Sequence, residues 1–142
     1  MVNLKYVSMV ISQAAKLNSE IEFVPLKGMN RVEVLTTLLS ATAYLDLGVF
    51  PGPDSIPREP IPSYCNIITS TMGSCNNNED VPIPLNYKFD IRRKNIKKIA
   101  KKLVDITINY EKYNCDFEEY RKKSKKQFYS FHDDIRNTFE IN

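Results

Sequence analysis

The sequence has few of the residues that build metal centres, disulfide frameworks and catalytic triads. It contains 1 histidine and 3 cysteines in 142 residues. His132 alone makes a histidine-rich metal site or a Ser-His-Asp triad hard to build. Cys65, Cys75 and Cys115 are odd in number and widely spaced, so they form neither a metal-binding cysteine pair nor a disulfide framework. We therefore expect a reducing, cytoplasmic location and no bound metal.

Long apolar runs are also lacking. No stretch approaches the roughly 20 apolar residues that cross a bilayer. The apolar N-terminal segment is broken by Ser, Gln and Lys, unlike a secretory signal. Hydrophobic residues nevertheless make up 42% of the chain and charged residues 26%, a balance typical of globular proteins and unlike that of disordered chains. At this length we predict one domain, or a domain with an appendage.

The net charge of +3 is distributed unevenly. Of the 20 lysines and arginines, 13 lie between Arg92 and Lys126. The first 90 residues are close to neutral and hold all 8 prolines and all 4 glycines. This change of composition predicts a compact α/β domain over residues 1–90 and basic helices packed on it over residues 91–142.

Hydrophobic periodicity alternates between helix and strand along the first part of the chain. One helix is predicted over residues 4–17, and a second begins with a capping box at Asn30 and Glu33 and ends near Ala41. Strands are predicted over residues 21–25, 43–48 and 66–70. From Ile91 the pattern is helical almost to the end, with a second helix over residues 117–139.

This alternation predicts an α/β fold: a short parallel Rossmann-like sheet flanked by helices, with a basic C-terminal helical tail. In such sheets, ligands bind outside the carboxyl ends of the strands. Those ends are predicted at residues 25–30, 48–59 and 70–80, which are also the polar segments that carry Gly and Pro. Both observations predict a binding site at this edge of the sheet.

Several of these segments resemble sequence motifs of a known family. They are Pro25-Leu-Lys-Gly-Met-Asn30, Tyr44-Leu-Asp-Leu-Gly48, Pro51-Gly52, Ile56-Pro-Arg-Glu59, Asn66-Ile-Ile-Thr69, Gly73-Ser74 and Glu79-Asp-Val-Pro-Ile-Pro84. Together they resemble the C-terminal, nucleotide-sugar-binding half of glycosyltransferases with two facing Rossmann-like domains, the GT-B architecture. The resemblance covers nearly the whole chain.

The resemblance implies binding of a nucleotide-diphosphate sugar for glycosyl transfer, without a metal or other cofactor. It implies that Glu59 accepts hydrogen bonds from the ribose diol. A diphosphate is bound by backbone N–H groups or basic side chains. Gly73 and Ser74, in the loop after a strand, suit the first kind of contact, whereas Arg58 and Lys27 are nearby cations in the sequence.

Further donor-site candidates are Gly48, at the end of a strand, and Gly52, in the loop that follows. Asp54 is the nearest carboxylate to the position where retaining enzymes of this kind carry the first glutamate of a spaced pair. A GT-B enzyme also has an N-terminal acceptor domain of similar size. The resemblance therefore implies a fragment, a degenerate paralogue or a half that works with a partner, either an acceptor-domain chain or a second copy in a homodimer.

Other interpretations of these features stay open. Glu59 can be a surface or capping carboxylate beside Arg58, and Gly48 and Gly73 can serve only as turn residues with positive φ. The fold can also belong to a non-catalytic interaction subunit. The basic helices suit a solvated face better than a nucleic-acid interface because acidic residues dilute their charge. Contact with an anionic membrane surface is a further expectation.

Overall fold

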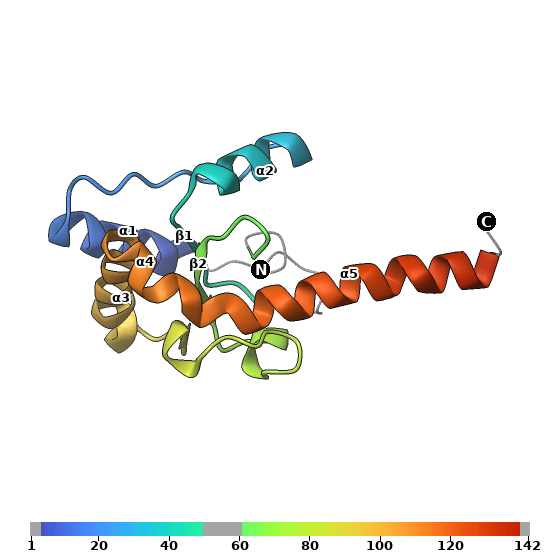
Figure 1. Ribbon diagram of the computed structural model, residues 1–142. Helices are drawn as coiled ribbons and strands as arrows, with labels where there is room; N and C mark the ends of the chain where they lie inside the picture. Colours follow the sequence, from blue (N-terminus) through green and yellow to red (C-terminus); the bar gives the residue numbers. More distant parts are fainter. Residues whose placement is uncertain (1–3, 50–60, 140–142) are drawn as a thin grey trace.

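The computed structural model describes residues 4–49 and 61–139 (Figure 1). Its helices and strands are α1 (Leu4–Leu17), α2 (Arg31–Ser40), β1 (Ala43–Asp46), β2 (Asn66–Ser70), β3 (Lys88–Phe89), α3 (Ile96–Ile108), α4 (Tyr110–Asn114) and α5 (Glu118–Phe139). Short 3₁₀ helices are η2 (Ser74–Asn76), η3 (Leu85–Tyr87), η4 (Arg93–Asn95) and η5 (Cys115–Phe117).

The three strands form one parallel sheet in the order β1-β2-β3. Ala43 lies opposite Asn66 in the first pair, and Thr69 lies opposite Lys88 in the second. Every residue of β2 is buried, as expected for the central strand of a parallel sheet. The predicted α/β fold class, with a parallel sheet packed against helices, is therefore confirmed.

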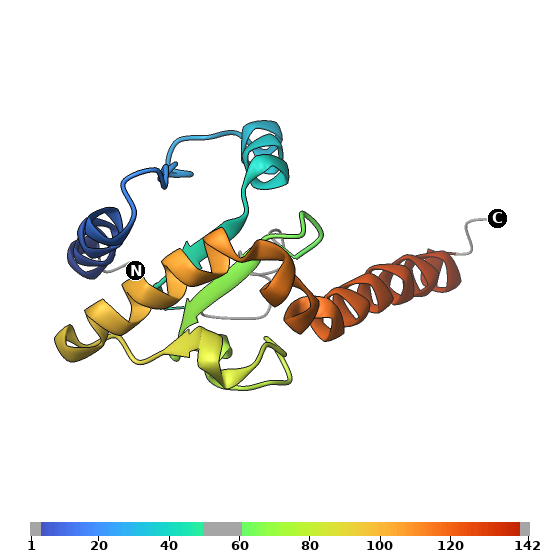
Figure 2. The same ribbon diagram turned by 60° about the vertical axis from the view of Figure 1, so that its left-hand side comes forward.

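The predicted strand over residues 21–25 is wrong, because this segment has no regular secondary structure. It connects α1 to α2 and runs apart from the sheet in both views (Figures 1 and 2). Its alternating pattern arises because Ile21 and Phe23 are half-buried, whereas Glu22 and Val24 are exposed. Apolar residues at every second position indicate only that one side of an extended segment is buried. A strand also needs a hydrogen-bonded neighbouring strand.

Helix α3 covers one face of the sheet and carries the longest apolar stripe (Figure 2). The buried residues of this stripe are Ile96, Ile99, Ala100, Leu103 and Ile106. The helix begins at Ile96 rather than at Ile91 because η4 forms the turn between β3 and α3.

Helix α1 packs on α3, where Val10 and Ala14 are fully buried. Thus α3 covers the apolar face of the N-terminal segment. Helix α1 has the predicted bounds.

Helix α2 begins at the predicted capping box. The Asn30 side chain accepts hydrogen bonds from the N–H groups of Val32 and Glu33, and the Glu33 carboxylate accepts one from the Asn30 N–H. The helix stands off the sheet in both views (Figures 1 and 2). Only Leu38 of α2 is buried, so local capping, rather than burial of a full apolar face, defines the start of this helix.

Hydrogen bonds connect the end of α3 and both ends of α4 to the beginning of β2. Asn66 is fully buried and donates to the carbonyls of Ile106 and Tyr110, at 3.0 and 3.3 Å. Its side-chain oxygen accepts a hydrogen bond of 3.0 Å from Asn114. Helix α5 then extends away from the sheet (Figures 1 and 2).

Candidate functional site

The three turns that follow the strands lie at one edge of the sheet, because the strands are parallel. They begin at Leu47 after β1, at Thr71 after β2 and at Asp90 after β3. This is the edge at which α/β sheets bind their ligands. The predicted candidates Gly48, Gly73 and Ser74 belong to two of these turns.

The ends of β1 and β2 are tied together at Gly48. Its N–H donates to the Asp46 carboxylate at 2.8 Å, and its carbonyl accepts a hydrogen bond of 2.5 Å from the Ser70 hydroxyl. The same hydroxyl accepts one from the Met72 N–H at 3.2 Å. Gly48 is buried and does not have a positive φ, so a turn conformation does not explain the glycine at this position. Its peptide groups hold neighbouring strands together at the edge.

Gly73 differs from Gly48 in its backbone. It has φ 64° and ψ −140°, a conformation open almost only to glycine. Directly after it, η2 turns Cys75 into the core, where the side chain is fully buried. Burial raises the pKa of the Cys75 thiol to about 11, so Cys75 packs as a neutral side chain at neutral pH. The Gly73–Ser74 turn is therefore a well-defined structure rather than a loose loop.

The loop from Asn77 to Val81 is fastened by a buried lysine. The Lys88 ammonium donates to the Asn77 carbonyl at 2.9 Å, to the Asn78 side chain at 2.8 Å and to the Val81 carbonyl at 2.7 Å. Burial lowers the pKa of Lys88. The sequence alone does not single out this residue, because a lysine is ordinarily a surface group.

A cluster of three cations also lies at the carboxyl edge. The sequence had predicted that these residues belong to the basic helices of the C-terminal tail. Arg92, Arg93 and Lys94 form the exposed turn between β3 and α3, and Arg92 pairs with Asp90 at 2.5 Å. The lysines of α5 instead lie on a helix that comes after α4, and it is Asn114 of α4 that donates to Asn66 at the amino edge of the sheet. The basic residues are thus divided among the β3–α3 turn and helices α3, α4 and α5.

Four of the predicted donor-site residues, Gly52, Asp54, Arg58 and Glu59, lie outside the described residues. Lys27 is described, but it belongs to another surface. It lines a shallow pocket of about 460 Å³, whose other lining residues are Gly28, Met29, Val32, Glu33, Thr36 and Thr37. The structure thus brings Gly48 close to the end of β2, and places Lys27 beside the first turns of α2.

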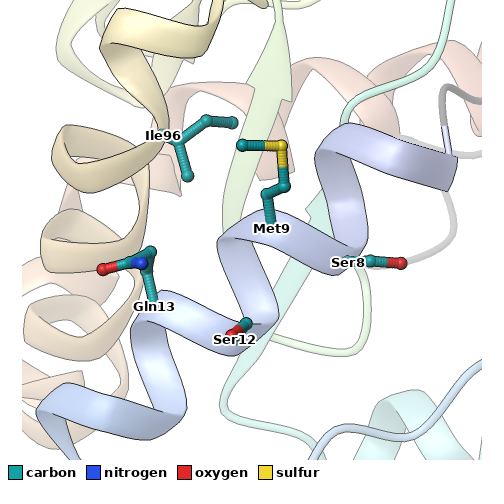
Figure 3. A pocket seen from close by; sticks show the side chains of 5 residues that line it. All are labelled: Ser8, Met9, Ser12, Gln13 and Ile96. Carbon is teal, nitrogen blue, oxygen red and sulfur yellow. The ribbon is translucent and has the colours of Figure 1, made fainter.

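A second shallow pocket, of about 250 Å³, lies between α1 and the start of α3 (Figure 3). Its lining residues are Ser8, Met9, Ser12, Gln13 and Ile96. The side chains of Met9 and Ile96 point toward each other in Figure 3. The Ser8 hydroxyl donates to the Leu4 carbonyl of its own helix, at 2.9 Å. This pocket adjoins the β3–α3 turn through Ile96, but its lining contains no charged group.

Within residues 4–49 and 61–139, no group of three or more His, Cys, Asp or Glu side chains is arranged to hold a metal ion. The same residues contain no helix with the length and apolar character needed to cross a bilayer. Comparison with protein-family models, with curated proteins and with solved structures gave no match to this chain.

Proposed function

We propose that the chain binds a nucleotide-diphosphate sugar at the carboxyl edge of its sheet, as the donor-binding half of a GT-B glycosyltransferase does. The observation that carries this proposal is the convergence of three turns at that edge. The first contains Gly48, the second Gly73 and Ser74, and the third three exposed cations. The sequence resemblance to the same half of these enzymes supports the proposal independently.

The chemistry of these turns suits a diphosphate. Two phosphate groups need hydrogen-bond donors and positive charge. Arg92, Arg93 and Lys94 supply exposed positive charge at the edge, and the absence of a Cβ on Gly73 leaves room for close backbone approach. The ribose diol is assigned to Glu59 by the resemblance. The proposal assigns the acceptor to a separate domain or a partner chain.

A nucleotide titration by calorimetry tests this proposal. We expect the chain to bind at least one of the uridine, guanosine and adenosine diphosphate sugars. Glu59→Ala should weaken this binding about tenfold to a hundredfold, because it removes charge-assisted hydrogen bonds worth about 1.5–3 kcal/mol. Glu59→Gln should lose less, since its amide keeps one acceptor.

Glu111→Ala is the matched control for this titration. Glu111 is an exposed carboxylate on α4, next to Tyr110, whose carbonyl contacts the beginning of β2 at the opposite edge of the sheet. Its removal should leave nucleotide affinity unchanged. Absence of binding at millimolar nucleotide, or equal losses in the two alanine variants, would show that the assigned site is wrong.

A second candidate function, an interaction subunit that pairs with another copy of itself, is favoured by α2. Val32, Leu35 and Leu39 recur at helical spacing and are 73%, 50% and 64% exposed. Apolar side chains gathered on one helix face are typical of interfaces. We therefore propose self-association through α2 as the alternative.

Sedimentation velocity distinguishes this alternative. A wild-type dimer that becomes a monomer in Leu35→Asp is the expected result, because a buried carboxylate in the interface is unfavourable. Leu85→Asp is the control, since Leu85 is 71% exposed on η3. A wild type that stays monomeric at high concentration contradicts the alternative.

A further inference from the structure

Lys88 is an unusual lysine because it is buried and all of its hydrogen bonds go to one short loop. Only 6% of the residue is exposed. An ammonium group has three N–H donors, and each of them has an oxygen acceptor here, at 2.7–2.9 Å. Two of the acceptors are backbone carbonyls and the third is the side-chain oxygen of Asn78. The lysine therefore holds the loop by its backbone.

The loop held by Lys88 also has its own internal bonds. The Asn77 side-chain oxygen accepts from the N–H groups of Glu79 and Asp80, at 2.9 and 2.8 Å. Its amide nitrogen donates to the Asp80 carboxylate at 2.9 Å. These bonds shape the turn locally, whereas the ammonium connects it to the sheet. Loss of the ammonium would leave a turn with its local shape but without its main anchor to β3.

The anchored loop is continuous with the turn that contains Gly73 and Ser74. The Asn76 N–H donates to the Gly73 carbonyl at 3.1 Å, and the Asn77 N–H donates to the Ser74 carbonyl at 3.5 Å. In the sheet, Lys88 lies opposite Thr69, so its side chain starts one residue before the end of β2. The segment from Gly73 to Val81 is thus fixed at one end by β2 and at the other by Lys88.

We propose that Lys88 is a positioning residue, which holds residues 73–81 in the conformation that presents Gly73 and Ser74 to the diphosphate of a nucleotide sugar. The identity of the ligand rests on the proposed function. The anchoring of the loop by Lys88 does not depend on it. Lys88 acts through the loop, because its three donors are already occupied. It sets affinity for the phosphate groups and leaves contacts with the base and ribose unchanged.

The test compares Lys88→Met with Lys101→Met, in which an exposed lysine of α3 is replaced. Hydrogen exchange should show the amides of residues 77–81 exchanging about tenfold faster in Lys88→Met, with the amides of β2 still protected. Affinity for a nucleoside diphosphate should fall about tenfold, while affinity for the nucleoside changes less than about twofold. Lys101→Met should change neither quantity.

The results separate this inference from the proposed function. Faster loop exchange in Lys88→Met supports the anchoring, and if the wild type then binds no nucleotide, the proposed function alone fails. Unchanged loop exchange overturns the inference. Equal losses of nucleoside and nucleoside diphosphate affinity overturn it as well, because a general loosening would affect both ligands.

A second measurement covers the case in which Lys88→Met does not fold. In the ¹⁵N-labelled wild type, the Lys88 ammonium protons should be protected from exchange with water, and their resonance should shift with nucleoside diphosphate but not with nucleoside. Lys88→Gln, which keeps an amide donor, should show an intermediate rate of loop exchange. An unprotected ammonium signal, or one that responds equally to both ligands, contradicts the inference.

Discussion

Ile106→Ala is expected to lower the free energy of unfolding by about 2–5 kcal/mol, the range measured for large-to-small changes in protein cores. Ile106 is fully buried on the face of α3 that packs on the sheet. Removing three of its side-chain carbons forfeits their transfer free energy and leaves a cavity beside β2. Urea denaturation followed by circular dichroism measures the change.

Ile108→Ala, two residues further along α3, is the control for this prediction. Ile108 is 58% exposed, so its removal takes little apolar surface out of the core. Alanine also has a higher helix propensity than isoleucine. We expect a change within about 0.5 kcal/mol. Similar losses in the two variants would contradict the arrangement in which one stripe of α3 faces the sheet.

Asn66→Ala is expected to cost about 3 kcal/mol, although it removes only a small polar group. The Asn66 side chain satisfies the carbonyls of Ile106 and Tyr110, and its oxygen accepts from Asn114. Alanine would remove all three hydrogen bonds at a fully buried position, and the Asn114 amide would keep only its bond to the Tyr64 carbonyl. Thermal and urea unfolding should both show the loss.

Asn109→Ala provides the matched comparison, because the same side chain is removed at an exposed position. Asn109 donates to the Asp105 carboxylate at 2.7 Å near the end of α3. Water can replace that hydrogen bond, so a loss below about 1 kcal/mol is expected. If Asn66→Ala were as mild as Asn109→Ala, the connection between β2 and the C-terminal helices would not depend on Asn66.

Local sequence signals predicted the elements that are held by local interactions. Helix α1 has its predicted bounds, α2 starts after the Asn30 capping box, and β2 occupies residues 66–70. Each of these signals, an apolar period or a cap, is contained within about ten neighbouring residues. The strand predicted over residues 21–25 failed because hydrogen-bond pairing depends on a distant segment. The third strand is instead Lys88–Phe89, which is too short to show a period.

For the candidate site, too, the sequence predicted some features and only the tertiary structure showed the others. The sequence by itself determined that glycine-bearing turns follow the strands, and a parallel sheet then places them at one edge. Only the tertiary structure showed that Lys27 belongs to the surface of α2, that Arg92–Lys94 reach the carboxyl edge, and that Lys88 and Asn66 are buried anchors. The reason is physical: residue type indicates which bonds a side chain can make, but its partners come from segments 7 to 48 residues away, which folding brings within reach.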